Sequence, residues 1–365
     1  MFYRETWAEI DLDALQENIR LCEAWTKKAV FAVIKANGYG HGDEYIARKA
    51  LSSGAKMLMV SSMDEALSLR NKKINGDILI LGYIHPKDVR LALKHGIRLT
   101  VTSLEWLKEI VKHPVDGLIV HVKYDTGMNR LGVKLQDEVR EILSICDLHG
   151  IQTEGIFTHF ASSDEEDNVL TSKQYEKFNE LLDSLDREFK WIHCANSDAA
   201  LHFQENRCNS TRLGLAIYGY STFNIGLKPV MRLYSKIVHV KQVEAGETVS
   251  YGATYSPKKT EWIATIPIGY ADGWSRRHQG DVAYINDEAC EYVGRVCMDQ
   301  TMIRLQTYHP VDTIVELLGD HADVVKMAKH METIPYEILT QVSDRIPKVY
   351  YENGKKIGEV HSRMK

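Results

Sequence analysis

Short apolar, β-branched runs alternate with longer segments of helical period up to about residue 222. Within the longer segments, apolar residues recur at spacings of three and four, as on the buried face of an amphipathic helix. This alternation predicts repeated β–α units. Clear helical patterns cover residues 11–25, 42–52, 135–148 and 171–185. The predicted strands are residues 30–35, 57–61, 77–81, 98–102, 117–123, 153–158, 190–194 and 212–218.

The predicted strands are almost continuously apolar, which is typical of parallel strands covered on both faces. Their alternation with helices favours an α/β fold with an N-terminal (β/α)8 TIM barrel, and an open doubly wound sheet is the alternative. After residue 222 the pattern changes to short strands separated by Gly, Pro and Asp turns, which predicts a C-terminal antiparallel β domain. The expected domains are residues 1–222 and 223–365, with the N-terminal strand at 1–10 a candidate to pack on the β domain.

Composition and charge exclude several classes of partner. The chain has 365 residues, with 45 Lys and Arg against 50 Asp and Glu, and a formal net charge of −5. This balance, without a basic run, argues against nucleic acid and anionic membrane surfaces as partners. No apolar run reaches the length of about 18 residues that a membrane-spanning helix needs. Small molecules are therefore the expected partners.

The cysteines and the N-terminus indicate a cytoplasmic protein. Six cysteines are scattered without CxxC spacing, as expected of reduced thiols rather than a disulfide framework or a zinc ribbon. Cys146 and His149 have a spacing seen in metal sites, but a lone pair on a surface-patterned helix is not expected to bind a metal. No metal site is predicted. The N-terminus carries acidic residues where a signal peptide would need an apolar run.

Polar residues follow several predicted strands, at the end of a barrel where active sites lie. Lys35 ends the first strand and precedes a glycine-rich segment, residues 36–42. A lysine desolvated there favours a Schiff base with a carbonyl group, although Lys35 taken alone is better explained by extension to the barrel rim. The segment lacks the spacing of known phosphate loops, so it is weak evidence by itself.

Eight segments resemble, in the same order, signatures of the alanine racemase family. Five lie in the predicted barrel: AVIKANGYGHG, YDTGMNRLG, FTHFASSD, HCANSDA and RLGLAIYG. Three lie in the β domain: VSYGATY, IPIGYADGW and GRVCMDQTM. The resemblance covers nearly the whole chain. It implies an isomerase that uses pyridoxal 5'-phosphate (PLP) to interconvert L-alanine and D-alanine and supplies D-alanine for peptidoglycan, and a head-to-tail homodimer whose active sites combine both subunits.

The resemblance also implies roles for individual residues. Lys35 would hold PLP covalently and then act as one of two acid/base groups, with Tyr251 of the partner subunit as the second. Two opposed groups suit racemisation because the proton leaves one face of the α-carbon and returns to the other. Arg212 would face the pyridine nitrogen, where a guanidinium donates a hydrogen bond but keeps its proton.

Further contacts follow from the same resemblance. Arg130 would contact the phenolic oxygen of the cofactor and the substrate carboxylate. Lys123 would carry a carbamate formed with CO₂ and so orient Arg130. His159 would hydrogen-bond Arg212 or Tyr251. The implied phosphate-binding residues are Tyr39, Ser197, Gly214 and Leu215, and the implied partner residues at the substrate entrance are Met298 and Tyr270, whereas Asp299 is expected to be structural.

Three positions depart from the common family pattern. Leu213 replaces a frequent proline and Asn129 a frequent glycine, and both should be tolerated. Asp344 stands where many members have a tyrosine near the entrance, so a serine or broad-specificity racemase is an alternative. A decarboxylase would normally place a carboxylate at the pyridine nitrogen, which Arg212 argues against. A non-catalytic PLP-binding protein would lack the β domain that carries Tyr251.

Overall fold

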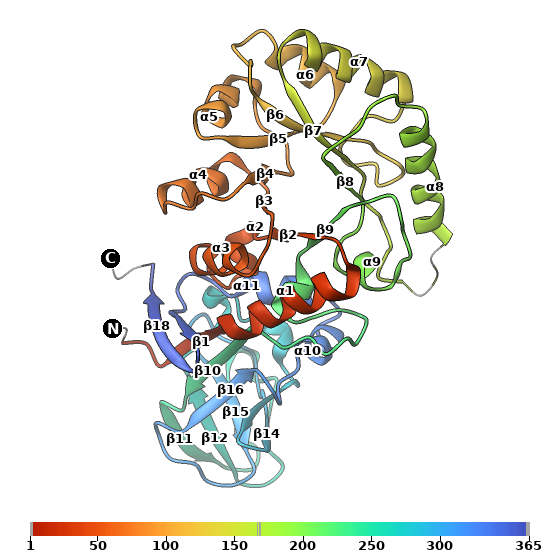
Figure 1. The fold of residues 1–365 in the computed structure, drawn as a ribbon. Helices are drawn as coiled ribbons and strands as arrows, with labels where there is room; N and C mark the ends of the chain where they lie inside the picture. The colour runs from red at the N-terminus through yellow and green to blue at the C-terminus, as the bar shows by residue number, and fades with distance from the viewer. Residues whose placement is uncertain (1–2, 166, 168, 363–365) are drawn as a thin grey trace. The chain divides into compact units, whose positions relative to one another are not determined.

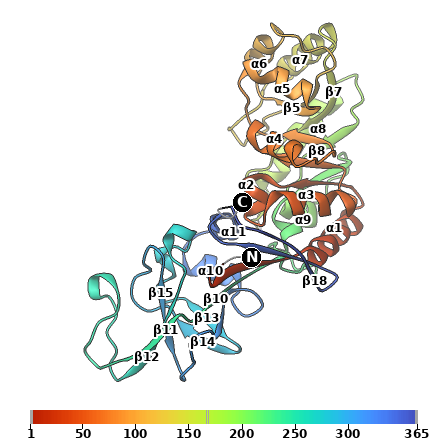
Figure 2. The same ribbon diagram turned by 90° about the vertical axis from the view of Figure 1, so that its left-hand side faces the viewer.

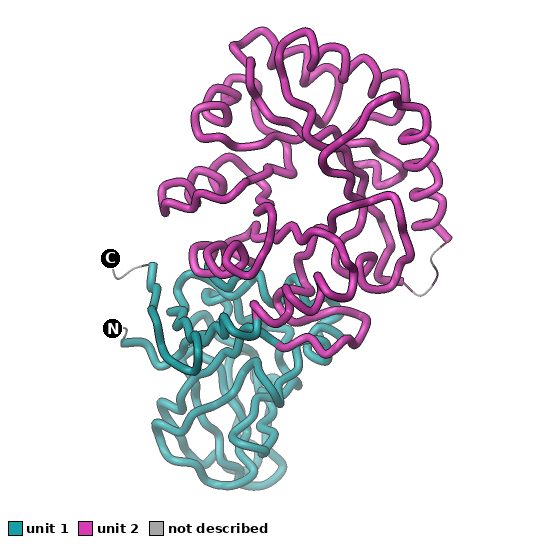
Figure 3. The backbone as a smooth tube through the Cα atoms, viewed as in Figure 1, with its two compact units in different colours: residues 1–14, 39–42, 229–365 teal, residues 15–38, 43–228 magenta. Residues whose placement is uncertain are grey.

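The computed structural model describes residues 3–165, 167 and 169–362 (Figure 1). Its internal contacts divide the chain into two compact units, which Figure 3 colours separately. Residues 15–38 and 43–228 form one of them, called the barrel unit below. Residues 1–14, 39–42 and 229–365 form the other, the β unit.

The barrel unit is built on eight parallel strands in the order β8-β7-β6-β5-β4-β3-β2-β9. The backbone N–H groups of Asn209 and Arg212 donate to the carbonyls of Ile192 and Ala195 at 3.1 and 3.0 Å, which joins the two ends of the sheet. The predicted (β/α)8 barrel is therefore confirmed. The strands are β2 (Ala29–Val33), β3 (Met57–Val60), β4 (Ile78–Ile80), β5 (Ile97–Val101), β6 (Ile119–Lys123), β7 (Gln152–Phe157), β8 (Trp191–His193) and β9 (Ser210–Leu213).

The helices lie around the outside of the strands, as Figure 1 shows, so both faces of the sheet are covered. This explains the continuous apolar runs, because β3, β4, β5 and β9 are buried at every position. Serine N-caps begin two of the helices, at Ser62 and Ser103. The helices are α1 (Leu12–Thr26), α2 (Lys35–Tyr39), α3 (Asp43–Ser52), α4 (Met63–Asn71), α5 (Val89–Lys94), α6 (Leu104–Ile110), α7 (Gln136–Leu148), α8 (Val169–Asp183) and α9 (Ser197–His202).

The last predicted barrel strand, residues 212–218, is wrong in its second half. The strand β9 ends at Leu213, and Leu215–Tyr218 form a 3₁₀ helix. Gly214 separates the two elements with φ −101° and ψ −95°, a conformation outside both strand and helix. The error arises because all four residues of the turn are buried, and a short buried apolar run looks the same in either element.

The β unit contains a seven-stranded sheet in the order β14-β13-β16-β10-β1-β17-β18 and a three-stranded sheet in the order β11-β12-β15 (Figure 2). The predicted antiparallel domain is confirmed, with one parallel pair, β1 with β17. The strands are β1 (Thr6–Asp11), β10 (Met231–Lys236), β11 (His239–Val243), β12 (Glu261–Ile266), β13 (Val282–Ile285), β14 (Glu288–Glu291), β15 (Thr301–Leu305), β16 (Ile314–Leu318), β17 (Lys348–Glu352) and β18 (Lys355–Val360).

Two short helices, α10 (Val324–His330) and α11 (Pro335–Gln341), complete the β unit. The first strand of the chain, β1, lies between β10 and β17, with Ile10 opposite Met231 and Tyr350. Among the described residues, no helix combines the length and the apolar character needed to cross a membrane.

Candidate active site

The segment after β2 has an unusual backbone. Lys35 opens it, and Ala36, Asn37 and Gly38 follow with φ of 51°, 53° and 61°. Tyr39 continues the left-handed conformation at φ 52°. Left-handed geometry costs a non-glycine residue about 1–2 kcal/mol, so surrounding contacts must hold this turn.

Side chains from neighbouring helices hold the turn in place. The carboxylate of Glu65 accepts a hydrogen bond from the Ala36 N–H at 2.7 Å and another from the Ser61 N–H at 2.7 Å. The Asn37 side-chain oxygen accepts from the Asp43 N–H at 2.9 Å, at the start of α3. The turn is therefore braced on both sides, which fixes the backbone that carries Lys35.

Burial and charge both favour an uncharged Lys35 amine. Burial lowers the pKa of Lys35, and the nearby Arg130 lowers it further, while Glu65 opposes the shift. An unprotonated amine is the form that attacks a carbonyl carbon.

Arg212 on β9 is buried in the barrel with its guanidinium held by neutral acceptors. Its Nη1 donates to His193 Nδ1 at 2.8 Å. Its Nη2 lies 2.9 Å from the Thr158 carbonyl, 2.7 Å from the Cys194 carbonyl and 3.0 Å from His159 Nδ1. Burial lowers the pKa of Arg212 to about 10, so it remains a cation at neutral pH. Its Nε–H has no hydrogen-bond partner in the described part of the chain.

Ser197, Gly214 and Leu215 meet at the end of the barrel sheet. Ser197 begins α9, and its hydroxyl oxygen accepts from the N–H groups of Gly214 and Ala216, each at 3.1 Å. The Leu215 N–H, at the start of the 3₁₀ helix, has no partner among the described residues. Unpaired amide groups at such positions suit an anion.

Lys123, at the end of β6, is buried, and no carboxylate of the described residues forms an ion pair with it. Its Nζ lies 5.9 Å from the centre of the Phe157 ring. Burial lowers the pKa of Lys123 to about 8, with Arg130 and Arg212 adding to the shift and Asp125 opposing it. A substantial neutral fraction of this amine is therefore present near neutral pH.

Arg130 lies at the end of a turn organised by Asp125. The Asp125 carboxylate accepts from the N–H groups of Gly127 and Asn129, each at 3.0 Å. Asn129 has φ 57°, a conformation that suits glycine and that asparagine also tolerates. The departure from the family's frequent glycine at this position is therefore accommodated, and the Arg130 side chain is exposed.

The cations of the barrel unit act together on His159. Burial lowers its pKa well below the usual value, and four cations add to this effect. His159 is therefore neutral beside Arg212 at physiological pH. The barrel unit thus brings Lys35, Lys123, Arg130 and Arg212 into one positively charged cluster.

The remaining expected site residues lie in the β unit. Tyr251, Tyr270 and Met298 are 71%, 45% and 53% exposed. Backbone hydrogen bonds join two of their segments, from the Tyr270 N–H to the Cys297 carbonyl and from the Ala271 N–H to the Met298 carbonyl, each at 3.0 Å.

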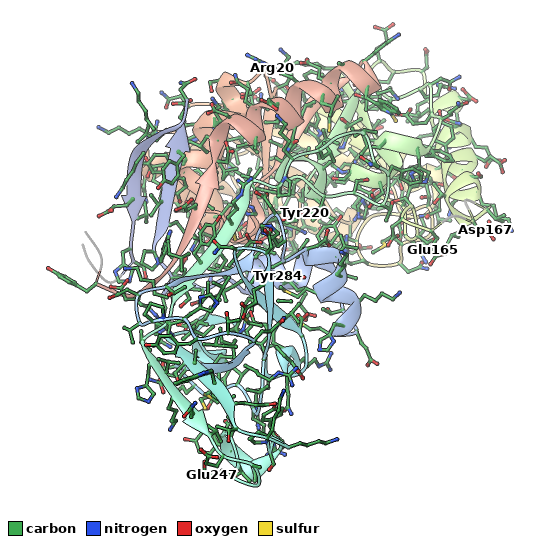
Figure 4. All side chains as sticks on the ribbon, turned by 90° about the horizontal axis from the view of Figure 1, so that it is seen from below. Arg20, Glu165, Asp167, Tyr220, Glu247 and Tyr284 are labelled. Carbon is green, nitrogen blue, oxygen red and sulfur yellow. The ribbon has the colours of Figure 1, made fainter. Side chains whose placement is uncertain are left out.

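The segment that carries Tyr251 is hydrogen-bonded to the segment that carries Met298. The Ser250 hydroxyl donates to the Arg295 carbonyl at 2.6 Å. Figure 4 labels Glu247 in the same loop, between β11 and β12. The structure therefore brings Tyr251, Tyr270 and Met298 onto one exposed surface of the β unit, called the tyrosine surface below.

Tyr39 and Asp344 also belong to the β unit. Tyr39 is buried, which raises its pKa, and its ring centre lies 5.9 Å from that of Tyr336. Asp344 follows α11, and its carboxylate lies 3.5 Å from the Nζ of the buried Lys348. Asp299, expected to be structural, forms an ion pair with Arg345 at 2.8 Å.

Among the described residues, one group has metal-ligand side chains in close proximity: Cys194, Glu205 and Cys208. The two sulfur atoms are 3.2 Å apart. Glu205 already forms an ion pair with Lys28 and accepts from the Cys208 N–H, and burial helps raise the pKa of Cys208. This chemistry does not favour a bound metal, which prefers deprotonated thiolates.

Sequence reasoning missed three residues behind Arg212, two of them buried histidines and the third a partly buried glutamate. His193 contacts His121, which contacts Glu154. Both histidines interrupt otherwise apolar runs, GLIVHVK and KWIHC. That interruption was the available signal, because a histidine inside a barrel strand needs polar partners.

Comparison with known proteins identifies the family of the chain. The alanine racemase N-terminal domain matches residues 10–222, and the alanine racemase C-terminal domain matches residues 230–350. The chain is 43% identical to an alanine racemase of Geobacillus stearothermophilus, covering 100% of this chain and 97% of that protein. It is 41% identical to alanine racemase 1 of Bacillus subtilis, covering 97% of this chain and 95% of that protein.

A solved structure supports the same family assignment. An alanine racemase of Bacillus anthracis, crystallised with bound L-Ala-P, superposes with a TM-score of 0.93 at 38% identity, covering 99% of this chain and 98% of that one. The family domains together match most of the chain, in the order of its two folds. The chain belongs to the alanine racemase family.

Proposed function

We propose that this chain interconverts L-alanine and D-alanine with PLP as cofactor, and that it supplies D-alanine for peptidoglycan. The full-length similarity to alanine racemases supports the reaction. The observation that carries the proposal is the cationic cluster of the barrel, in which a lysine with a lowered pKa lies within electrostatic range of other fixed cations.

The residues of the barrel unit fit PLP. The cofactor offers an aldehyde, a ring nitrogen, a phenolic oxygen and a phosphate, each of which needs a different partner. The Lys35 amine suits the aldehyde, and the unpartnered Nε–H of Arg212 suits the ring nitrogen. The unpaired Leu215 N–H suits a phosphate oxygen, beside Ser197 and Gly214. Arg130 suits the phenolic oxygen and the substrate carboxylate.

The proton transfers are assigned to two side chains. When bound, PLP supplies an electron sink that makes the α-proton of the amino acid acidic. Lys35 holds or removes the proton on one face of the α-carbon, and Tyr251 does so on the other. His159, which is neutral beside Arg212, positions that arginine or the tyrosine.

Arg212 determines which reaction follows. Its guanidinium donates a hydrogen bond to the ring nitrogen and keeps its own proton, because its pKa of about 10 is far above that of a pyridine nitrogen. With Arg212 beside it, the ring nitrogen would stay unprotonated, which would limit how much negative charge the bound cofactor could accept. Rapid return of the proton is favoured over side reactions such as transamination.

Lys123 is proposed to carry a carbamate. The neutral amine attacks CO₂, a C–N bond forms, and one proton is released, which leaves an anion at the end of β6. That anion would orient Arg130 and offset part of the cationic cluster. The lowered pKa of Lys123 supports this assignment, since a neutral amine is the reactive form.

The working enzyme is proposed to be a head-to-tail homodimer. The tyrosine surface presents large side chains to solvent, which indicates a surface that another protein covers. A second copy would bring Tyr251, Tyr270 and Met298 to its partner's barrel. The monomer would then lack its second acid/base group.

The decisive experiment measures conversion of pure L-alanine, and separately of pure L-serine, into the D enantiomer by the purified protein with PLP. Rapid conversion of alanine and slow conversion of serine are expected. Serine conversion at an equal or higher rate would instead support a serine or broad-specificity racemase. Racemisation of neither amino acid would overturn the proposed function.

Two observations bear on the alternatives. Asp344, where relatives often have tyrosine, leaves room for a broader substrate range, because its side chain is 65% exposed. A non-catalytic PLP-binding protein is tested by Tyr251→Phe, which should abolish most racemisation while the absorption of bound PLP remains. A carrier would be indifferent to this change.

A further inference from the structure

Four side chains form a continuous chain of hydrogen bonds through the barrel, one from each of β9, β8, β6 and β7. Arg212 Nη1 lies 2.8 Å from His193 Nδ1. His193 Nε2 lies 2.9 Å from His121 Nδ1, and His121 Nε2 lies 3.3 Å from a carboxylate oxygen of Glu154. Both histidines are fully buried.

The direction of these hydrogen bonds is fixed by the two ends of the chain. A guanidinium only donates, so His193 Nδ1 must accept and its single proton lies on Nε2. That proton is donated to His121 Nδ1, which leaves the proton of His121 on Nε2 as well. Glu154, a carboxylate, only accepts and so takes this last proton. With neutral imidazoles, one arrangement satisfies all three hydrogen bonds.

The environment supports neutral histidines and an ionised Glu154. Burial lowers the pKa of both His193 and His121. Burial alone would raise the pKa of Glu154, but hydrogen bonds from His121, Arg98 and Lys190 hold it well below its usual range. Arg98 and Lys190 lie 2.6 and 2.8 Å from this carboxylate, so its position is also fixed from the opposite side.

Aromatic contacts fix the orientation of the central imidazole. The Phe157 ring stacks on His193 with a centroid distance of 4.7 Å and an interplanar angle of 10°. Phe31 approaches His193 edge-on at 5.4 Å. The Arg212 guanidinium also lies over the Phe157 ring, with its central carbon 5.2 Å from the ring centre. Rotation of His193 would break its contacts with Phe157 and Phe31 together with two hydrogen bonds.

We propose that Glu154, acting through His121 and His193, is a positioning residue for Arg212, and that this chain fixes which guanidinium N–H is presented to the cofactor ring. Arg212 has two N–H-bearing edges, and the histidine chain binds the Nη1 side. Its Nε–H is thereby left for the ring nitrogen. The inference rests on the proposed function, because it assigns Arg212 to that nitrogen.

The first test uses the unmodified holoenzyme. Nitrogen-15 NMR of labelled histidine side chains should show two neutral imidazoles protonated at Nε2, with protons that exchange slowly with water. Their signals are assigned by their loss in His121→Gln and His193→Gln. Protonation of either ring at Nδ1, or at both nitrogens, would overturn the proposal. This measurement does not depend on racemase activity, so it remains informative if the proposed function fails.

The second test compares Glu154→Gln with Glu109→Gln, a matched change in an exposed ion pair between Glu109 of α6 and Lys112, which follows that helix. Glutamine can still accept from His121 but has no charge, so the hydrogen bond weakens. Glu154→Gln should shift the visible absorption of bound PLP and lower kcat about tenfold, with KM for alanine within about twofold. Glu109→Gln should change none of these.

A merely structural role for Glu154 would lower Tm without moving the absorption spectrum or separating kcat from KM. Unchanged spectrum and kcat in a folded Glu154→Gln enzyme would therefore overturn the positioning role, even if wild-type enzyme racemises alanine. If Glu154→Gln does not fold, the histidine NMR of the wild-type enzyme decides the question.

Discussion

At the scale of single residues, the barrel unit concentrates positive charge where an anionic cofactor and an amino-acid carboxylate are proposed to bind. Lys35, Lys123, Arg130 and Arg212 all act on His159. Such a cluster is costly to assemble unless ligands or a modified side chain neutralise it. The repulsion lowers the pKa of the two lysines, because a lysine can lose its proton and an arginine cannot.

Carbamate formation on Lys123 should follow the pKa of its amine. With a pKa of about 8, roughly a tenth of the amine is neutral at pH 7, against less than about a thousandth for an ordinary lysine. At fixed dissolved CO₂, occupancy should rise with pH until the site is full, because carbamate formation releases a proton. The rise should be steeper below a pH of about 8, where the ammonium must first lose a further proton. Carbon-13 NMR in labelled bicarbonate measures this, with Lys123→Met as the blank. No carbamate signal in the wild-type enzyme at pH 8 would contradict the assignment.

Asp344 should influence substrate choice. Asp344→Tyr replaces a carboxylate with a larger ring and should lower serine turnover more than alanine turnover, because a larger group narrows the entrance. Asp344→Asn is the control: both variants weaken the contact with Lys348, but asparagine adds no bulk. Steady-state kinetics with both amino acids gives the ratio. Equal reductions for serine and alanine in Asp344→Tyr would exclude a role in specificity.

At the scale of elements, the left-handed turn after β2 is the feature that presents Lys35. Gly38 has φ +61°, and a Cβ there would meet the Ile46 side chain at 3.4 Å, so alanine is strained more by its backbone than by contact. Gly96 has φ +57° with nothing within 4 Å of a Cβ. An alanine would therefore meet the same backbone strain at both positions, but only Gly38 lies beside the candidate site.

Gly38→Ala and Gly96→Ala should each lower the free energy of unfolding by about 1 kcal/mol, because alanine is disfavoured at positive φ. Only Gly38→Ala should also weaken PLP binding, since it strains the backbone next to Lys35. Urea unfolding and PLP titration measure the two effects. Equal PLP affinity in both variants would show that the turn does not control the cofactor site.

Elements were predictable wherever their pattern was periodic or bounded. The barrel strands and α1, α3, α7 and α8 were found because apolar runs and helical spacing alternate. The strands β16, β17 and β18 were not predicted: β16 lies in a short segment without clear alternation, and the β17–β18 hairpin mixes charged and apolar residues. The turn at Leu215 was misread because burial removed the periodicity that separates strand from helix.

At the scale of the whole molecule, the proposed dimer predicts complementation between two inactive variants. Lys35→Ala removes one acid/base group and Tyr251→Phe the other. A mixed dimer would contain one site with both changes and one site with neither. Coexpression in equal amounts should therefore restore about a quarter of wild-type activity, since half of the dimers are mixed and each has one intact site.

The control for complementation is each variant expressed alone, which should be nearly inactive. An equal mixture as inactive as the separate variants would contradict shared active sites, provided that both proteins fold. Light scattering gives the mass of the mixed species and establishes whether subunits have associated.

The site itself was predictable only in part, and the reason is physical. Lys35, Arg130, His159 and Arg212 follow strand ends within recognisable motifs, so their proximity follows from barrel geometry. The chain of His193, His121 and Glu154 depends on side chains from non-consecutive segments meeting inside the barrel. No local pattern records such a meeting, and two interrupting histidines were its only trace.

The position of β1 has a consequence for biosynthesis. This strand leaves the ribosome before every other described strand and helix, yet its neighbours β10 and β17 begin at Met231 and Lys348. The barrel strands are all translated before either neighbour exists. Throughout that time β1 is an unpaired strand with Ala8 and Ile10 uncovered, a target for chaperones and for mispairing between nascent chains. Translation of β17 therefore ends the period in which β1 lacks one of its two pairing partners.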